Sequence, residues 1–239
     1  MIDIKGLTVE YEGGIKALDG VDLVISEGDS LGLIGANGAG KSSLFRSLTG
    51  LTAFEGSVMF NGLEVIKKNM PEIRKDIGYV IQESDDQMFM PKVIEDMIFG
   101  PVNYGMSKDD AVKKAEEILE QLEISHLKDR YNHKISGGEK KMAAIATILM
   151  MKPKVILFDE PTSSLDPHNR RIVLNAIKGI DATKIIASHD LDLIYDTCEK
   201  VVLLNHGRIV KVGSRDDILR DADLLEKNGL ELPLSISGR

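Results

Sequence analysis

The sequence predicts an α/β fold in which a parallel sheet carries a phosphate-binding loop, and three features indicate it. Val155–Phe158 is a continuous apolar run and Lys184–Ser188 has an apolar centre, as expected for strands buried on both faces of a parallel sheet. A third run, Leu31–Ile34, is followed by a glycine-rich loop and then by a helical pattern over 43–48. This strand–loop–helix order is the one that a phosphate-binding loop requires.

The loop fits the pattern G-x-x-x-x-G-K-[ST]. Glycines allow a tight turn that points successive backbone N–H groups at one anion, and the dipole of the following helix adds to the attraction. We expect Lys41 to reach the β- and γ-phosphates of a nucleotide and the Ser42 hydroxyl to hold Mg²⁺. The loop consists of Gly35, Ala36, Asn37, Gly38, Ala39, Gly40, Lys41 and Ser42.

An antiparallel β region is expected before and after this loop. Residues 2–10 and 21–25 alternate loosely between apolar and polar side chains, which predicts two strands joined by a turn. Ser57–Phe60 precedes Asn61-Gly62, a dipeptide that favours a hairpin turn. Tyr11 ends the first strand, where it is either a half-buried strand tyrosine or an aromatic face for adenine.

A helical insertion is expected over 83–150. Apolar residues recur at three- and four-residue steps in 108–123, after a Ser107–Asp110 pair that resembles a capping box. A second helix is expected from Ser136, as its N-cap, through Leu149.

The start of this insertion is less regular. Residues 83–89 are polar and then apolar, and we expect Pro91 and Pro101 to break the segment into short helices. Met88 and Phe89 are either a surface for docking a partner or part of an ordinary subdomain core.

After the helical insertion, the chain is expected to alternate between strands and helices. We expect a helix over 172–180, a hairpin over 201–212 and one short helix in the tail. The predicted organisation is a single domain over 1–239, with a β subdomain and phosphate-loop core in 1–82 and 151–212, a helical subdomain in 83–150 and a C-terminal tail in 213–239.

Polar side chains end three of the predicted buried strands. In parallel sheets the carboxyl ends of the strands face the ligand crevice, so Asp159 is expected to contact Mg²⁺ through water. Glu160 is then positioned to orient or deprotonate a water molecule that attacks the γ-phosphate. His189 follows the strand predicted at 184–188, and Gln82 follows a further predicted buried strand, Ile77–Ile81. Both are expected at the same crevice, Gln82 as a contact for Mg²⁺ or water.

Composition narrows the class of protein. The 239 residues carry a formal net charge of -8, with a sequence pI near 5.2, and this argues against nucleic acid as a partner. No apolar run approaches the roughly 20 residues that span a bilayer, so we expect any membrane role to depend on a partner.

In order and along nearly the whole chain, these motifs resemble those of the ATP-binding cassette (ABC) ATPases, whose nucleotide-binding domain has a P-loop NTPase sheet, an antiparallel β subdomain and a helical insertion. Ile135–Glu139 is similar to the LSGGQ signature, Val155–Asp159 to Walker B, and Ser163–Asp166 to the D-loop. The resemblance makes Glu160 the catalytic glutamate. The other residues that it implies for ATP, Mg²⁺ and hydrolysis are Tyr11, Gly35–Ser43, Gln82, Ser136, Gly137, Gly138, Glu139, Asp166 and His189.

The resemblance also implies a mechanism. Two cassettes dimerise head to tail around two ATP molecules, so that Ser136 and Gly138 of one subunit touch the γ-phosphate bound by the other. Hydrolysis then releases the dimer. The second subunit is either another copy of this chain or a paralogue.

A narrower likeness is to the energy-coupling-factor (ECF) transporter ATPases. Gln82–Phe89 is similar to their Q-N-P-D-D-Q-L/I-F stretch, and Leu224–Pro233 looks most like the cobalt/nickel (CbiO) type. This implies a peripheral protein on the cytoplasmic face of the cell membrane, partnered by a transmembrane coupling protein and a substrate-binding membrane protein. Met88 and Phe89 are then a docking surface.

The departures from these families are local. Ile135 and Glu139 replace Leu and Gln of the signature, Glu83-Ser84 replaces Asn-Pro, and Met142 stands where relatives usually carry Arg. The alternatives are the ATPase of another ABC transporter, a soluble ABC ATPase of repair or translation, and a phosphate-loop kinase. The D-D-Q stretch argues against an exporter, the lack of a long coiled coil against a repair ATPase, and Ser136–Glu139 against a kinase.

Overall fold

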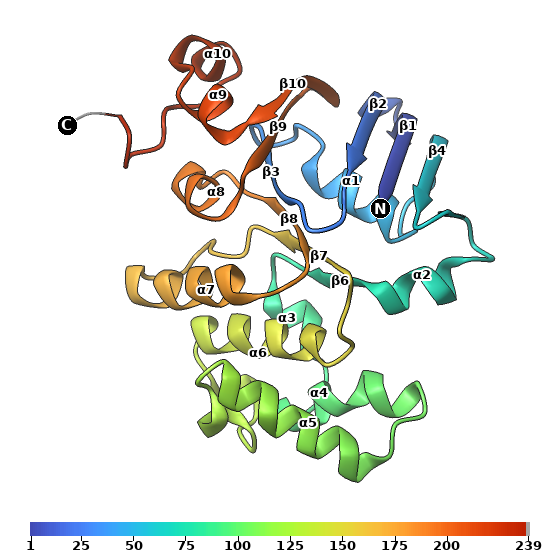
Figure 1. Ribbon diagram of the computed structural model, residues 1–239, viewed down its shortest axis with the longest axis vertical. Helices are drawn as coiled ribbons and strands as arrows, with labels where there is room; N and C mark the ends of the chain where they lie inside the picture. The colour runs from blue at the N-terminus through green and yellow to red at the C-terminus, as the bar shows by residue number, and fades with distance from the viewer. Residues whose placement is uncertain (238–239) are drawn as a thin grey trace. The chain divides into compact units, whose positions relative to one another are not determined.

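The computed structural model describes residues 1–237, and the chain divides into two compact units (Figure 1). The first unit comprises Met1–Ile77 and Asp181–Arg239, and the second comprises Gly78–Ile180. The predicted helical subdomain, 83–150, therefore falls inside the second unit.

The first unit contains the predicted antiparallel sheet. Its order is β2-β1-β4-β5. Inward-facing residues of β1, such as Ile4 and Val9, are buried, which is the origin of the alternating sequence pattern. The predicted Asn61-Gly62 turn is confirmed, because both residues have positive φ, 49° and 81°, as a tight hairpin requires. The strands are β1 (Ile2–Tyr11), β2 (Ile15–Ile25), β4 (Glu55–Phe60) and β5 (Leu63–Glu64).

The first unit also contains parallel strands, which confirms the predicted class of sheet. β3 (Ser30–Ile34) pairs in parallel with β8 (Thr183–Ala187) on one side and with β9 (Lys200–Asn205) on the other. β10 (Arg208–Ser214) runs antiparallel to β9 and completes the predicted hairpin. The parallel pairing places the carboxyl ends of β3, β8 and β9 at one edge.

Helices flank both sheets of this unit. Two of them, α2 and α8, were not predicted, although Pro71 near the start of α2 and the Asp190 side chain that caps α8 are helix-start signals. The tail forms two short helices where one was expected. The helices are α1 (Lys41–Leu48), α2 (Met70–Asp76), α8 (Leu191–Thr197), α9 (Arg215–Leu219) and α10 (Ala222–Lys227).

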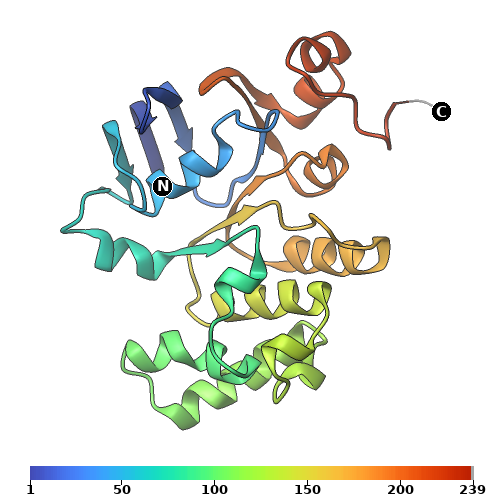
Figure 2. The same cartoon turned by 180° about the vertical axis from the view of Figure 1, so that it is seen from behind.

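The second unit is mostly helical. β7 (Val155–Asp159) is buried along its whole length, as its sequence predicts, and lies beside β6 (Ile77–Val80). In both views α6 packs between α7 and the α4–α5 pair (Figures 1 and 2). The helices are α3 (Ser84–Gln87), α4 (Val93–Asn103), α5 (Lys108–Gln121), α6 (Gly137–Leu149) and α7 (Pro167–Gly179), with 3₁₀ turns η1 (Ser125–Leu127) and η2 (Asn132–Lys134).

Three expectations about this unit are corrected. Pro101 lies inside α4 and does not end it, because a proline in the last turn removes only one hydrogen bond of the helix. α7 begins at Pro167 and not at 172, since the side chain of Asp166 caps it. Met88 is only 7% exposed and belongs to the core, whereas its neighbour Phe89 is exposed.

Within residues 1–237, every helix is too short or too polar to cross a lipid bilayer.

Two isoleucines on strands of the first unit test how much the parallel strands stabilise it. Ile185 of β8 is fully buried, whereas Ile15 of β2 is 66% exposed. We expect Ile185→Ala to lower the free energy of unfolding by about 2–5 kcal/mol, through lost transfer energy and a cavity. Ile15→Ala should change it by less than about 0.5 kcal/mol. Urea denaturation followed by circular dichroism measures both, and equal effects would contradict the assigned strand positions.

Candidate functional site

The phosphate loop connects β3 to α1, and the neighbouring backbone explains its glycines. A Cβ atom on Gly35 would lie 2.2 Å from the Leu204 carbonyl oxygen, and one on Gly40 would lie 2.4 Å from the Ala17 carbonyl oxygen. The Gly207 N–H also donates to the Ala39 carbonyl, at 3.0 Å. The loop is therefore fixed from outside by β2 and by the β9–β10 hairpin.

The first turn of α1 suits an anion. It contains no acidic side chain, so the positive end of the helix dipole is not neutralised. Lys41 begins the helix and is buried, and its Nζ donates to the Gly35 carbonyl at 2.7 Å. The cation thus lies against the inner side of its own loop, whereas Asn37 and Gly38 lie exposed at the crest.

Tyr11 lies beside the start of α1. Its hydroxyl is 3.2 Å from the Ser43 Oγ, and its side chain is partly exposed. Burial raises the pKa of the Tyr11 hydroxyl, but hydrogen bonds with Ser43, Arg46 and Thr52 outweigh it and the pKa lies below its usual value. The contact joins the end of β1 to the phosphate-loop helix, and the predicted stacking on adenine stays a prediction.

His189 lies at the same sheet edge as the loop. Ala187 of β8 is in register with Leu33 of β3, and the Ser188 N–H donates to the Leu33 carbonyl at 3.3 Å. His189 follows two residues after the end of β8, as the phosphate loop follows β3. The first unit therefore brings together the predicted loop, Tyr11 and His189.

In the second unit, the acidic pair ends β7. The Asp159 side chain is 4% exposed; its Oδ2 accepts a hydrogen bond from the Tyr79 hydroxyl at 3.0 Å, whereas its Oδ1 has no partner among the described residues. Glu160 is also buried and has a positive φ of 46°. Such backbone strain in a non-glycine residue is concentrated at functional sites.

Tyr79 was not singled out from the sequence. It comes from β6, next to β7, and Gln82 follows shortly after that strand with its side chain exposed. The available signal was a tyrosine in an otherwise apolar strand, because a buried tyrosine hydroxyl usually finds a polar partner.

The predicted signature residues form the amino end of α6. The Ser136 side chain accepts from the Glu139 N–H, and the Glu139 carboxylate accepts from the Ser136 N–H at 2.8 Å, so the two form a capping box. This backbone hydrogen bond lowers the pKa of Glu139, and His126, 3.3 Å away, adds to the effect. His126 is a further neighbour that the sequence did not reveal.

Asp166 caps the adjacent helix, α7. Its carboxylate accepts from the backbone N–H and the side-chain amide of Asn169, and also from the His168 N–H, and these bonds lower the pKa of Asp166. The two amino ends lie close together, since a Cβ atom on Gly138 would lie 2.3 Å from the Asn169 Cγ. The second unit therefore groups the signature with the D-loop residue, and Asp159 with Tyr79.

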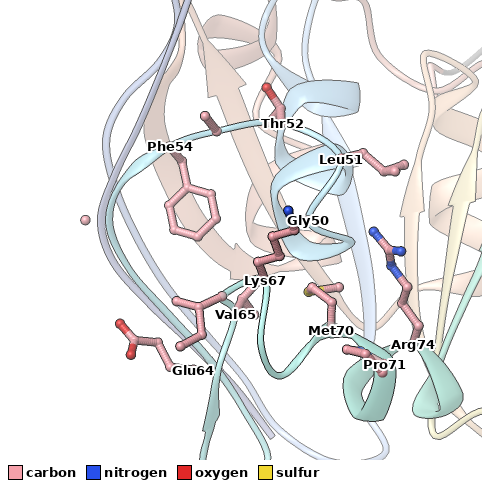
Figure 3. Close-up of a pocket in the computed structure, with 13 residues that line it drawn as sticks. Gly50, Leu51, Thr52, Phe54, Glu64, Val65, Lys67, Met70, Pro71 and Arg74 are labelled. Atoms are coloured by element: carbon pink, nitrogen blue, oxygen red, sulfur yellow. The ribbon is translucent and has the colours of Figure 1, made fainter.

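A pocket of about 760 Å³ lies elsewhere in the first unit (Figure 3). Phe54, Met70 and Arg74 line it, and Arg74 donates to the Thr49 carbonyl at 3.1 Å. The pocket begins at Gly50, beyond the carboxyl end of α1, whereas the phosphate loop is at the amino end. The eight residues of α1 separate the two by about 12 Å, so this pocket is not the phosphate site.

Met142 is buried on α6 and borders a smaller pocket of about 280 Å³, together with Leu122 just after α5 and Ala176 of α7. At this departure from the family pattern, the buried Met142 side chain therefore borders a pocket with both apolar and polar lining residues, among them Gln121 and Asn175.

Comparison with known proteins identifies the family. Residues 18–163 match the family described as ABC transporter. A putative ABC transporter ATP-binding protein of Geobacter sulfurreducens is 39% identical over the whole chain, which covers 96% of that relative. The energy-coupling factor transporter ATP-binding protein EcfA of Carboxydothermus hydrogenoformans is 41% identical over 98% of this chain and 88% of the relative.

Comparison with solved structures points to the same family. The structure of cbiO1 from Clostridium perfringens, described as part of the ABC transporter complex cbiONQ, has a TM-score of 0.83 at 33% identity and covers 95% of this chain and 93% of that one. A dimeric ATP-binding cassette in a post-hydrolysis state, bound to ADP and Pi, has a TM-score of 0.82 at 26% identity, with 90% and 99% covered.

The chain belongs to the ABC transporter family, as one of its ATP-binding subunits with the ABC ATPase fold and ATPase activity. The resemblance to the ECF ATPases that the sequence indicated is confirmed by the EcfA and cbiO1 relatives.

Two adjacent glycines at the start of α6 differ in their surroundings. A Cβ atom on Gly137 would meet nothing within 4 Å, whereas one on Gly138 would collide with Asn169. We expect Gly138→Ala to lower the free energy of unfolding by about 1–3 kcal/mol through overpacking. Gly137→Ala should leave it within about 0.5 kcal/mol of the wild-type value. Urea titrations measure both, and a tolerated Gly138→Ala would contradict the close approach of α6 and α7.

Proposed function

We propose that this protein is the ATP-hydrolysing subunit of an ECF-type importer, with Co²⁺ or Ni²⁺ as cargo. The observation that carries the ATPase role is the constrained phosphate loop with the buried Lys41 and an unneutralised helix terminus. The ECF assignment is supported by the EcfA relatives and by cbiO1, and the metal cargo by the likeness of the tail to the cobalt/nickel type.

Mg²⁺ is the proposed metal cofactor, and the residues fit it. Asp159 Oδ1 is a buried carboxylate oxygen without a partner among the described residues, and such an atom is costly unless an ion or water satisfies it. Mg²⁺ is typically bound by one or two carboxylates together with substrate phosphates. Ser42 and Gln82 would supply the other protein oxygens, and the ion would neutralise charge on the phosphates.

Hydrolysis is assigned to Glu160 and its neighbours. A buried carboxylate beside the Mg²⁺ residue is suited to orient and deprotonate the attacking water. The backbone of Glu160 has a positive φ and begins a turn in which the Ser163 N–H donates to the Glu160 carbonyl at 3.2 Å. His189, at the edge that carries the phosphate loop, is proposed to contact the γ-phosphate.

A second cassette is proposed to complete the site. Ser136 and Gly137 lie exposed at the amino end of α6, where backbone N–H groups attract an anion. We assign the γ-phosphate held by the partner subunit to this position, with Asp166 nearby. Support comes from the dimeric relative bound to ADP and Pi. The partner is a second copy of this chain or a paralogue.

Membrane proteins are the other proposed partners, and they place this subunit at the cytoplasmic face of the membrane. Phe89 is 64% exposed and packs edge-on against the exposed Phe99, with ring centroids 5.0 Å apart. The buried Asp96 holds this segment by accepting from the N–H groups of Phe89 and Met90. We propose that the coupling protein docks on the Phe89–Phe99 pair. Phe99 replaces Met88 in the predicted docking surface, because Met88 is buried.

The ATPase role predicts a distinct outcome for Glu160→Gln. This variant should bind ATP but hydrolyse it at least about 100-fold more slowly, since it lacks the base, and it should form a stable dimer with ATP and a second copy or the paralogue. Phosphate release measures the rate of hydrolysis, and light scattering measures dimer formation.

Lys41→Ala is the matched control. It removes the positive charge that is proposed to bind the nucleotide phosphates, so this variant should neither bind ATP nor dimerise. Wild-type turnover by Glu160→Gln would place the base elsewhere.

The transporter role predicts what the protein carries with it from its native membranes. Purification in mild detergent should yield two small membrane proteins, a coupling protein and a substrate-binding protein, together with bound Co²⁺ or Ni²⁺ measurable by elemental analysis. Phe89→Asp should weaken the complex without changing ATP binding. Recovery of a single large permease would overturn the ECF assignment, and recovery of ribosomes or DNA would overturn the transport role.

A further inference from the structure

Helix α6 carries a buried cation two residues after the signature, Ile135–Glu139. Lys141 is 3% exposed, and its Nζ donates to the carbonyl oxygens of Ile81, at 3.1 Å, and Gln82, at 2.7 Å. Lysine is almost never fully buried unless its charge is paired. Burial lowers the pKa of Lys141, and the nearby carboxylates of Glu83 and Asp159 oppose this shift.

The two carbonyls explain why a cation is useful here. β6 ends at Val80, so the peptide groups of Ile81 and Gln82 have left the strand just before the catalytic candidate Gln82. Backbone carbonyls that are removed from water need a donor. A lysine reaching from α6 supplies two hydrogen bonds at once, which an apolar side chain of the same length could not.

A second side chain, that of Gln87, also connects the segment after β6 to helix α6. Gln87 of α3 accepts from the Ile81 N–H through its Oε1, at 3.1 Å, and donates through its Nε2 to the Ala144 carbonyl of α6, at 3.2 Å. Lys141 and Gln87 together therefore satisfy both polar groups of Ile81 and bind them to the helix that begins at the signature.

We propose that Lys141 is a positioning residue for ATP hydrolysis, which fixes Gln82 to the signature helix so that Gln82 approaches the nucleotide of its own subunit while the signature approaches that of the partner. Lys141 does not touch the nucleotide; it acts through the backbone of Gln82, with Gln87 as the second fastening. The proposal rests on the proposed function, because it takes Gln82 and Ser136 as nucleotide contacts.

The test compares three variants of full-length protein. Lys141→Met keeps the length of the side chain but removes the charge and the donors. Lys141→Arg retains both. Lys140→Met is the matched control, since within residues 1–237 the ion-pair partner of Lys140 is Asp85, whose side chain is 78% exposed, and ion pairs with so exposed a partner contribute little.

We expect Lys141→Met to lower kcat for ATP hydrolysis by about 10- to 100-fold through misplacement of Gln82. Its KM for ATP should stay within about 2-fold, because the phosphate loop is intact. Lys141→Arg should recover most of the rate, and Lys140→Met should behave as wild type. Wild-type turnover by Lys141→Met, or an equal loss in Lys141→Arg, would overturn the proposal.

A double-mutant cycle distinguishes positioning from a purely structural role. If Lys141 acts through Gln82, Lys141→Met should have no further effect on kcat in a Gln82→Ala background. An undiminished effect there would overturn the proposal. If Lys141→Met does not fold, Gln87→Leu carries the same comparison. Absence of ATPase activity in the wild-type protein would instead refute the proposed function itself.

Discussion

The close approach of backbone to backbone around the phosphate loop is the constraint on which the rest of the first unit depends. Gly35 lies against the carbonyl of Leu204 and Gly40 against that of Ala17, so β2 and β9 must both be in place for the loop to adopt its shape. Lys41 lies against the inner side of this loop, where its Nζ donates to the Gly35 carbonyl. A Cβ atom at either glycine would move the loop or the strand behind it, because backbone cannot yield as a side chain can.

The second unit follows a different principle, in which helix ends and strand ends are fastened by polar side chains. Ser136 and Asp166 cap α6 and α7, Tyr79 holds Asp159, and Lys141 and Gln87 hold the segment after β6. Each of these bonds orients a group that the proposed mechanism needs. Only the Asp159 Oδ1 is a buried carboxylate atom without a partner within this part of the chain, and it is the atom that a bound Mg²⁺ would satisfy.

The division into two units fits the proposed use of ATP. The phosphate loop and His189 belong to one unit, whereas the acidic pair, Gln82 and the signature belong to the other. In the proposed dimer, each ATP molecule contacts the phosphate loop of one subunit and the signature of the other, and a difference in ATP affinity between the open and closed dimers is the way such a ligand shifts a conformational equilibrium. The hydrogen bond of Lys141 to the Gln82 carbonyl joins Gln82 to the helix that begins at the signature.

The sequence by itself determined the parallel strands, the phosphate loop, the caps of α5 and α6 and the hairpin turns, because each depends on the local chemistry of contiguous residues: apolar runs, glycine spacing, Ser107, Ser136 and Asn61-Gly62. Only the tertiary structure decided that Met88 is buried while Phe89 is exposed, that Pro101 lies within α4, and that Tyr79, His126 and Lys141 support the site. These depend on contacts between residues far apart in the chain, Lys141 with Gln82 and Tyr79 with Asp159. No local pattern records such pairs, since burial of a lysine or a tyrosine depends on what the fold places around it.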